Sequence, residues 1–400
     1  MTATAPAIPQ PPPPTRKPRG DILVTAFEPS GDDHAAVLIA ELKRRHPDLT
    51  IHALGGPKME AAGAHLIERT GEDAVMGVPT LDKVREHRAI NTRIAAWLDA
   101  NPIAMHIPVD SPAANFPICR LAKKRNITVC HLVAPQVWAW ATWRIRKLRR
   151  LSDLVLCVLP FEERWFRDRN VNARFVGHPL FTHPLDTEAL DAQASDLPTR
   201  KPRLALLPGS RPAELSRNFP LLLDSFRRLR QDRPNLEGVV AATTQPVADH
   251  LRTLADTTGG WPDRLHIVSG KTDAVLHWAD LALVTSGTVT LQVARHRPPM
   301  AIVYKSQSPM LYMVLQPLLF ATEFFTLPNL IAAREVVPEF VPHFEGHEPL
   351  TAAAARLLDD PEAAATQRAE LESIVQQFTA HNAATEAADA IEHLLLEPAH

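Results

Sequence analysis

Glycine and cysteine are both scarce in this sequence. Only 15 of the 400 residues are glycine, whereas about 7% would be ordinary. No G-x-G-x-x-G and no G-x-x-x-x-G-K-[ST] pattern occurs, which argues against a standard dinucleotide site and against a P-loop. The cysteines, Cys119, Cys130 and Cys157, form no C-x-x-C pair. Neither a zinc site nor a disulfide framework is therefore indicated, and a reducing cytoplasm is expected.

Long apolar runs and an excess of charge are also absent. A membrane-spanning helix needs about 18 uninterrupted apolar residues, and the nearest approach, residues 308–325, is broken by Gln316, Pro317 and Glu323. That stretch fits a core helix pair, a ligand-facing wall or an interfacial patch. The formal net charge of −2 gives no global electrostatic reason to expect nucleic acid. Residues 1–20 lack the apolar core of a secretory signal, and their proline run predicts a disordered tail.

Short apolar runs alternate with helical patterns over most of the chain, which is typical of βα units on a parallel sheet. Polar, proline-containing residues 183–202 predict an interdomain linker between two such series. We therefore expect an α/β protein of two doubly wound domains facing a cleft, residues 21–182 and 203–348, closed by C-terminal helices over 349–400. Strands are expected at residues 22–26, 51–55, 104–109, 129–133, 154–159 and 174–176, and then at 204–207, 239–242, 266–268, 281–285 and 301–304.

Two glycine-containing turns in the second half are candidates for phosphate binding. Each follows a predicted strand and precedes a helix, so backbone N–H groups, hydroxyls and a guanidinium can converge on an anion at the positive end of the helix. Such sequences are also common as simple turns and N-caps, but two of them in one domain favour a diphosphate ligand. The residues are Gly209, Ser210 and Arg211 in the first turn, and Ser286, Gly287 and Thr288 in the second.

Gln292 lies one helical turn after Thr288. From there its side chain can reach a ribose hydroxyl, or it can be a solvated helix residue.

Acidic residues follow two predicted strands in the first half. Asp110 comes after strand 104–109 and can accept a proton from a hydroxyl, as a general base must, or can cap the next helix. Glu28, Asp32 and His34 crowd the expected turn after strand 22–26, before a predicted helix. A magnesium site also fits these acids, but Arg211 and two helix N-termini would already meet a diphosphate, so we expect no metal. The choice of base between Asp110 and the Glu28/His34 cluster stays open.

The segment from His131 to Arg150 combines tryptophans with a run of basic residues. Nucleic acid, anionic lipid or a phosphorylated acceptor all fit such a patch. It can also be a solvated helix face with core tryptophans. The residues are Trp138, Trp140 and Trp143, then Arg144, Arg146, Lys147, Arg149 and Arg150.

Ten segments, taken in order along the chain, closely resemble the lipid-A-disaccharide synthase family (glycosyltransferase family 19). They are EPSGDDHAAVLIAEL, LGGPKMEAAGA, VMGV, VDSPAAN, APQVWAWATWRIRKL, DLVLCVLPFEERWF, FVGHPL, LALLPGSR, SGTVTLQ and LPNLIAAREVVPEF. The resemblance covers about residues 22–349 and most of the C-terminal helices. It implies a metal-independent, cofactor-free, inverting glycosyltransferase of GT-B architecture. Members join UDP-2,3-diacylglucosamine to 2,3-diacylglucosamine 1-phosphate (lipid X) by a β-1,6 linkage and release UDP.

The resemblance also implies roles for residues and a place of action. Asp110 matches the aspartate that assists the acceptor, and Asn329 and Arg334 match positions near the donor. The first turn, Trp138 and Asn115 are assigned to acceptor or sugar binding. A cytoplasmic enzyme, peripheral to the inner membrane and able to form a homodimer, is expected. The first-turn residues are Glu28, Ser30, Gly31 and Asp32.

Several positions depart from the family pattern. Phe27 stands for the usual glycine, Ala113 for an aspartate, Gln292 for a glutamate and Ala333 for a glycine. Ala113 and Gln292 motivate one alternative to the synthase, a catalytically weakened UDP-sugar or lipid-binding protein. A second alternative is a UDP-sugar 2-epimerase, which has the same fold and needs no acyl acceptor. Retained Asp110 and Arg211 and the apolar and basic segments favour the synthase.

Overall fold

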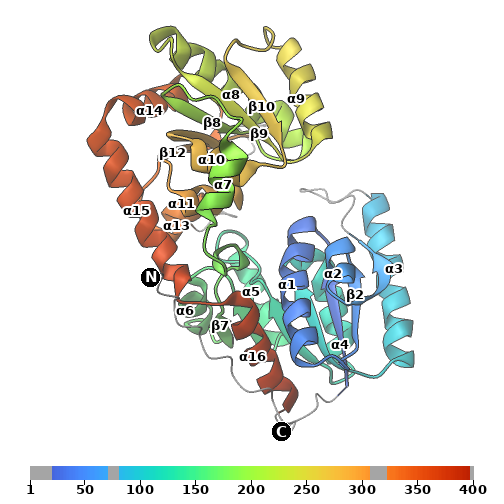
Figure 1. Ribbon diagram of the computed structural model, residues 1–400. Coiled ribbons are helices and arrows are strands. Elements are labelled where there is room, and N and C mark those ends of the chain that lie inside the picture. Colours follow the sequence, from blue (N-terminus) through green and yellow to red (C-terminus); the bar gives the residue numbers. More distant parts are fainter. Residues whose placement is uncertain (1–19, 71–80, 307–321, 397–400) are drawn as a thin grey trace, which may run out of the picture. The chain divides into compact units, whose positions relative to one another are not determined.

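The computed structural model describes residues 20–70, 81–306 and 322–396, and they divide into two compact units (Figure 1). The first unit contains the chain up to Gln136, Trp143–Pro179, and the residues from His381 onward. The second contains Leu180–Ala380 together with Val137–Thr142. The predicted N-terminal tail and most of the apolar stretch at 308–325 lie outside the described residues.

The first unit is built on a parallel sheet of seven strands in the order β3-β2-β1-β4-β5-β6-β7. Helices connect successive strands, and apolar side chains of β1, β4 and α1 share one core. The strands are β1 (Asp21–Ala26), β2 (Ile51–Gly55), β3 (His65–Arg69), β4 (Ile103–Val109), β5 (Thr128–Leu132), β6 (Leu154–Cys157) and β7 (Ala173–Phe175). The helices are α1 (Pro29–Arg45), α2 (Pro57–Ala61), α3 (Leu81–Ala100), α4 (Pro112–Lys123), α5 (Ile145–Leu151), α6 (Glu162–Arg167) and α16 (Ala383–Leu396). The short 3-10 helices η1 (Thr142–Arg144) and η2 (Pro179–Phe181) lie where the chain passes from one unit to the other.

The second unit repeats the plan with a parallel sheet of six strands in the order β10-β9-β8-β11-β12-β13. Its own core lies between this sheet and helices that include α8 and α14. The strands are β8 (Arg203–Leu207), β9 (Glu237–Ala242), β10 (Leu265–Ser269), β11 (Leu281–Thr285), β12 (Met300–Lys305) and β13 (Glu339–His343). The helices are α7 (Thr187–Ala194), α8 (Pro212–Asp232), α9 (Gln245–Asp256), α10 (Thr272–Trp278), α11 (Val289–His296), α13 (Leu327–Ala332), α14 (Glu348–Asp359) and α15 (Pro361–Thr379).

The strand order reverses once in each sheet. In the first sheet the reversal lies between β1 and β4, and in the second it lies between β8 and β11. Loops leave such a pair of strands in opposite directions, which opens a crevice at their carboxyl ends where ligands bind in doubly wound folds. The residues that directly follow β1, β4, β8 and β11 are therefore the first candidates for function.

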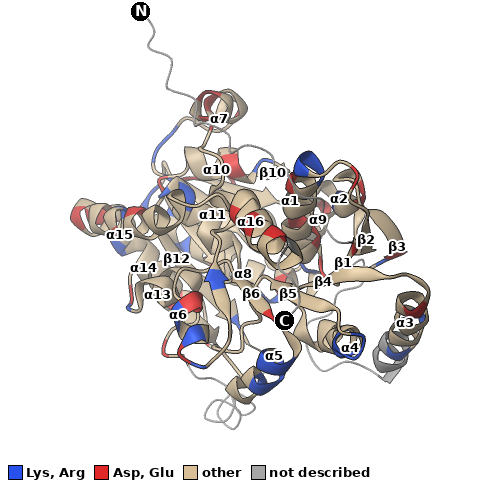
Figure 2. Cartoon of the chain, turned by 90° about the horizontal axis from the view of Figure 1, so that it is seen from below, with Lys and Arg blue, Asp and Glu red and all other residues tan. Residues whose placement is uncertain are grey.

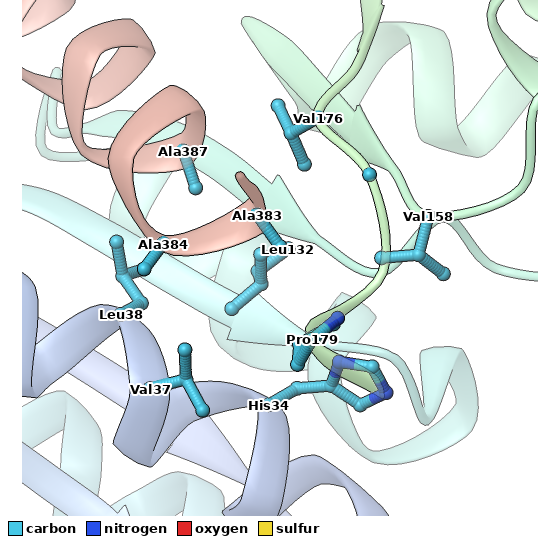
Figure 3. Close-up of a pocket in the computed structure, with 11 residues that line it drawn as sticks. His34, Val37, Leu38, Leu132, Val158, Val176, Pro179, Ala383, Ala384 and Ala387 are labelled. Carbon is cyan, nitrogen blue, oxygen red and sulfur yellow. The ribbon is translucent and has the colours of Figure 1, made fainter. Parts of the chain in front are cut away.

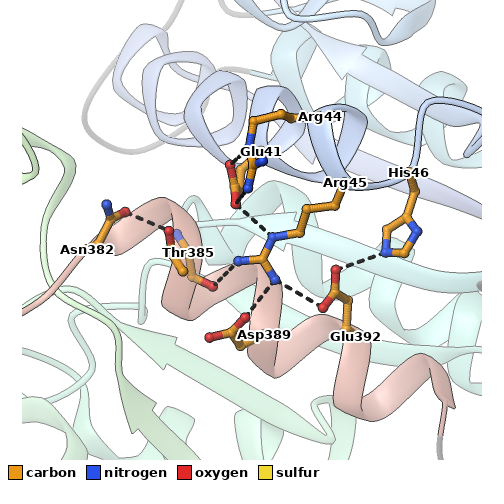
Figure 4. A network of polar contacts seen from close by, with 8 residues as sticks. All are labelled: Glu41, Arg44, Arg45, His46, Asn382, Thr385, Asp389 and Glu392. Carbon is orange, nitrogen blue, oxygen red and sulfur yellow. Dashed lines mark hydrogen bonds and ion pairs between the residues drawn. The ribbon is translucent and has the colours of Figure 1, made fainter. Parts of the chain in front are cut away.

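The last helix, α16, completes the core of the first unit. Its Ala387, Ile391 and Leu395 are buried in the same apolar cluster as Leu38 and Leu42 of α1. Above this contact, Arg45 is 7% exposed and links the two helices through four partners (Figure 4). Its guanidinium donates to the carboxylates of Glu41 at 2.7 Å, Asp389 at 2.6 Å and Glu392 at 3.0 Å, and to the carbonyl of Thr385 at 3.2 Å.

All eleven predicted strands are present, with ends that differ by at most two residues. Two short edge strands, β3 and β13, were not expected. The expected linker contains α7, which is capped by the Asp186 carboxylate and packs against α10. The turn expected after β1 is wrong in one respect, because α1 begins at Pro29 and already includes the residues from Ser30 to His34.

Candidate functional site

Glu28 and Asp110 lie at the strand-order reversal of the first sheet. Glu28 follows β1 and is the N-cap residue of α1, and Asp110 directly follows β4. The Ser111 hydroxyl donates to Glu28 Oε1 at 2.9 Å and so connects the two loops. Glu28 and Asp110 thus follow the two strands after which the sequence placed them, and their catalytic roles stay a prediction.

Asp110 has an unusual backbone conformation. Its φ is 41° and that of Ser111 is 37°, so two successive residues other than glycine occupy the left-handed region, at about 1–2 kcal/mol each. Burial and the nearby Glu28 carboxylate raise the pKa of Asp110 to about 6, against opposing effects of the Ser111 backbone and the Arg144 guanidinium. A carboxyl whose pKa lies just below neutrality is suited to general base catalysis at pH 7.

His34 lies in the second turn of α1, beside an apolar pocket (Figure 3). Its ring contacts that of His178 edge to face, with the centroids 5.0 Å apart. Burial lowers the pKa of His34 to about 4 and that of His178 to about 3, so both imidazoles are neutral at pH 7. The pocket walls come from α1, from the carboxyl ends of β5, β6 and β7, and from alanines of α16: Val37, Leu38, Leu132, Val158, Val176, Ala383 and Ala387.

The other predicted residues of the first turn differ in exposure. Ser30 is exposed at the N-terminus of α1. Gly31 packs against β1, where an added Cβ would lie 3.2 Å from that of Ala26. Asp32 is 6% exposed, and its carboxylate accepts backbone N–H bonds from Gly56, Lys58 and Met59 at 3.0–3.1 Å. The Asp32 side chain thus caps α2, a contact that the local sequence does not reveal.

Asn115 and Trp138 are both buried. The Asn115 amide is 0% exposed and binds the carbonyls of Val109 and Asp110. Trp138 is 3% exposed and belongs to the segment Val137–Thr142 that groups with the second unit. Neither observation tests their assignment to acceptor or sugar binding, which stays a prediction.

Gly209, Ser210 and Arg211 follow β8 at the reversal of the second sheet. Gly209 has φ 99°, and a Cβ there would meet Glu214 Oε2 at 3.2 Å, so glycine is required in this turn. Arg211 is the N-cap residue of α8, and its Nη1 donates to Glu214 Oε1 at 2.9 Å. The first predicted phosphate turn therefore has a guanidinium and a helix N-terminus at one strand end.

Ser286, Gly287 and Thr288 follow β11, the neighbouring strand at the same reversal. The first turn lies beside the end of β11, because a Cβ at Gly209 would lie 3.8 Å from Thr285 Cγ2. Further along α11, Gln292 Nε2 donates to Asp273 Oδ1 at 2.9 Å, and His296 Nε2 lies 2.7 Å from the same oxygen. These hydrogen bonds, that of His296 above all, lower the pKa of Asp273.

Asn329 lies in α13, and Arg334 lies in the loop between α13 and β13. The Asn329 amide is 0% exposed and binds the backbone of Val336 and Val337 and the carboxylate of Glu339. Arg334 is paired with Glu370. Ala333 has φ 53° at the C-terminus of α13, where a glycine would have no steric cost. Asn329 therefore shapes the loop that carries Arg334, and its placement near a donor stays a prediction.

Several polar residues near these strand ends were missed from sequence. Thr25 and His106 lie inside apolar strands, His178 follows β7, and Glu214 and Asp273 lie on helices. A histidine in IAMHIPV and a threonine in DILVTA are weak signals, because single polar residues in buried strands are common. Glu214 was the easiest of these residues to predict from sequence, because it lies three residues after Arg211 on a predicted helix, where the two side chains can pair.

Metal ligands and membrane spans were also sought in the part of the chain that the structure describes. There, no group of three or more histidine, cysteine, aspartate and glutamate residues is placed to hold a metal ion. No helix within residues 20–70, 81–306 and 322–396 has the length and apolar character needed to cross a bilayer.

Comparison with known proteins identifies the family. The family model described as lipid-A-disaccharide synthetase matches residues 22–392. The chain belongs to the lipid-A-disaccharide synthase family. A lipid-A-disaccharide synthase from Myxococcus xanthus (strain DK1622) is 35% identical over 82% of this chain and 84% of its own length. One from Pseudomonas aeruginosa (strain LESB58) is 32% identical over 94% and 98%.

Solved structures show the fold to which this family member belongs. The glycotransferase of kitacinnamycin has a TM-score of 0.64 at 17% identity and covers 95% of this chain and 100% of its own. A UDP-GlcNAc 2-epimerase from Neisseria meningitidis, bound to UDP-GlcNAc, has a TM-score of 0.61 at 11% identity over 94% and 100%. The predicted GT-B fold, with two Rossmann-like domains, is confirmed.

Proposed function

We propose that this protein condenses UDP-2,3-diacylglucosamine with 2,3-diacylglucosamine 1-phosphate to give lipid A disaccharide 1-phosphate and UDP. The observation that carries the proposal is membership of the lipid-A-disaccharide synthase family over residues 22–392. The strand-end residues of the two sheets supply chemical groups suited to this reaction.

Asp110 is assigned as the general base of the first unit. Its carboxylate takes the proton of the acceptor 6-hydroxyl while that oxygen forms a bond to the anomeric carbon of the donor. The bond from that carbon to the diphosphate oxygen breaks, and UDP leaves with the electron pair, so a single displacement inverts the anomeric centre. The pKa of Asp110, raised to about 6, suits this role better than that of His34, lowered to about 4.

The second unit is assigned to the donor. Arg211 and the two turns after β8 and β11 offer a bidentate cation and backbone N–H groups to a diphosphate. The Glu214 carboxylate accepts from Nη1 of the guanidinium, and arginine has further N–H donors that can bind a phosphate oxygen. Because these groups neutralise the leaving diphosphate, we propose that the reaction needs neither metal nor cofactor.

The acyl chains of both substrates place the reaction at a membrane surface, and we assign the contact to the cytoplasmic face of the inner membrane. Trp143 is 57% exposed, and Trp140, three residues earlier in the chain, is 45% exposed. Helix α5 follows directly, and lysine and arginine make up most of it (Figure 2). Four of its basic side chains are exposed, whereas Leu148 is buried. Trp143 and these basic side chains belong to the first unit, and an exposed tryptophan next to a basic amphipathic helix is suited to an anionic lipid surface. The basic residues are Arg146, Lys147, Arg149 and Arg150.

Removing two of these charges should weaken membrane binding selectively. Each basic residue near an anionic surface contributes about 1 kcal/mol, so Arg149→Ala with Arg150→Ala should reduce partitioning about thirty-fold. Sedimentation with phosphatidylcholine vesicles, with and without phosphatidylglycerol, measures the effect. The control pair Arg356→Ala with Arg368→Ala removes two exposed charges from α14 and α15. Equal loss in both pairs, or binding that ignores lipid charge, would contradict the assignment.

The function itself is tested with purified protein and UDP-2,3-diacylglucosamine, with and without lipid X, and with EDTA in parallel samples. Mass spectrometry follows UDP release and disaccharide. We expect disaccharide only when the acceptor is present, at a rate that EDTA does not change. Conversion of the donor sugar without acceptor would instead support an epimerase, and tight UDP binding without turnover would support a binding protein.

A further inference from the structure

A chain of buried hydrogen bonds lies beneath helix α4 and ends at Asp110. Thr25 of β1, His106 of β4 and Asn115 of α4 are each 0% exposed. Thr25 Oγ1 lies 2.9 Å from His106 Nε2 and 2.6 Å from Asn115 Oδ1. Asn115 Nδ2 in turn lies 3.0 Å from the Val109 carbonyl and 2.8 Å from that of Asp110.

The direction of every bond in this chain is fixed by its members. Asn115 Nδ2 faces two carbonyls and must donate, so Oδ1 points to Thr25 and accepts its hydroxyl proton. Because the Thr25 hydroxyl already donates its single proton to Asn115, Oγ1 must accept the hydrogen bond from His106 Nε2–H. Burial lowers the pKa of His106 to about 3, so the ring is the neutral Nε2–H tautomer at pH 7. All hydrogen bonds in this row therefore point the same way: His106 donates to Thr25, Thr25 donates to Asn115, and Asn115 donates to the Asp110 carbonyl.

These hydrogen bonds end at a backbone conformation that is unfavourable for residues other than glycine. Asp110 and Ser111 have φ values of 41° and 37°, which side chains other than glycine rarely adopt. The Asp110 N–H is held by the Leu132 carbonyl at 3.0 Å, and the Asp110 carbonyl is held by Asn115. Such a conformation persists only where the surroundings over-determine it, and it recurs at reactive residues.

We propose that Thr25, His106 and Asn115 are positioning residues that hold Asp110 in its left-handed conformation, so that the carboxylate is presented at the end of β4. The inference rests on the proposed function in taking Asp110 as the reactive carboxylate. In this proposal Asn115 supports Asp110 from within the core. Thr25 and His106, which look like ordinary buried strand residues in the sequence, take part in the same support. None of the three needs to touch substrate.

Removing one hydroxyl tests the chain at its centre. Thr25→Val keeps the shape but leaves Asn115 Oδ1 and His106 Nε2–H without their partner. We expect kcat to fall on the order of ten-fold or more, because small displacements of a catalytic group are costly, with KM for both substrates changed less than about three-fold. Thr25→Ser restores the hydroxyl and should return kcat to within about three-fold of the wild type. Ile391→Ala, a fully buried residue of the same unit, is the control for lost stability and should leave kcat unchanged well below its Tm.

A second readout does not depend on catalysis. Protein labelled with carbon-13 at aspartate carboxyls is titrated by NMR, and Asp110→Asn identifies the signal of Asp110. We expect the Asp110 titration to move by half a unit or more in Thr25→Val and to stay in place in Thr25→Ser and Ile391→Ala. If the wild type forms no disaccharide, the proposed function fails, and this titration still decides the positioning role.

The opposite results would overturn the inference. A Thr25→Val protein with a lower Tm but wild-type kcat and an unchanged Asp110 titration shows that the buried chain only stabilises the fold. If Thr25→Val does not fold, Thr25→Cys, whose thiol is a weak donor of similar size, takes its place with the same two readouts. An unchanged kcat and titration in that variant would contradict the role equally.

Discussion

Asp110→Asn should reduce kcat by about 10²–10⁴, the usual contribution of a general base, and leave the affinity for UDP within two-fold of the wild type. The reason is that asparagine keeps the size of the side chain but cannot accept the proton of the 6-hydroxyl. Steady-state turnover and UDP titration calorimetry measure the two quantities. Glu28→Gln is the informative companion, because it removes the neighbouring negative charge and keeps an acceptor for Ser111. Wild-type turnover in Asp110→Asn would end the assignment.

The pH dependence follows from the direction of the shift. Burial and Glu28 raise the pKa of Asp110 to about 6, and Arg144 opposes them. Only the ionised carboxylate accepts a proton, so kcat/KM, which reports the pKa of the free enzyme, should be constant above about pH 6 and fall about ten-fold per unit below it. In Glu28→Gln the midpoint should move to lower pH, because the repulsive charge is gone.

The same shift has a stability consequence with a definite sign. The folded pKa of about 6 lies above the ordinary value of 3.8, so ionising Asp110 destabilises the folded state at every pH above this window. The full cost would be about 3 kcal/mol, and partial contact with solvent reduces it. Asp110→Asn should thus stabilise the protein by about 1–2 kcal/mol at pH 7.5 and by nothing below about pH 4. Calorimetric melting at the two pH values measures this difference.

Arg211→Ala should weaken both donor binding and turnover. A charge-assisted bidentate contact contributes about 1.5–3 kcal/mol, so the Kd for UDP should rise about ten- to hundred-fold, and kcat should fall as well if the contact strengthens in the transition state. Arg211→Lys keeps the charge without the planar fork and should recover only part of the loss.

The matched control for Arg211 lies on the same helix. Arg228 of α8 is exposed and pairs with Asp232, so Arg228→Ala removes one positive charge away from the strand ends. UDP affinity should be unaltered in this variant. If the two alanine variants bind UDP equally, the diphosphate is held elsewhere and the assignment of the turn after β8 is wrong.

The positions of the strand ends could be predicted from the sequence better than the hydrogen-bond partners of the side chains near them. Runs such as ILVTA and LALL are apolar enough to be strands in any setting, and the carboxyl ends of parallel strands share one edge. This placed Glu28, Asp110 and Arg211 correctly at the two reversals. The edge strands β3 and β13 were missed because HLIER is polar and EFVPH contains a proline, which is tolerated at a sheet edge.

Contacts made by residues far apart in sequence could not be predicted. Asp32 caps a helix that begins 25 residues later, and the Asn329 amide is used entirely by its own loop and Glu339. The structure gives both side chains partners within the protein, and their assignments to sugar and donor binding stay predictions. Thr25 and His106 were missed for a related reason. They look like ordinary core residues of buried strands, and only the structure shows that they bind each other and that Thr25 binds Asn115.

Helix α16 has a consequence for how the protein is made. Most of the first unit is translated before the second, but Arg45 meets Asp389 and Glu392 only after helix α16 has left the ribosome. Until then the α1 surface that packs against Ile391 and Leu395 is uncovered. The N-terminal unit therefore waits through the synthesis of the whole second unit before its core closes, and a nascent chain interrupted before residue 383 exposes apolar surface to chaperones and proteases.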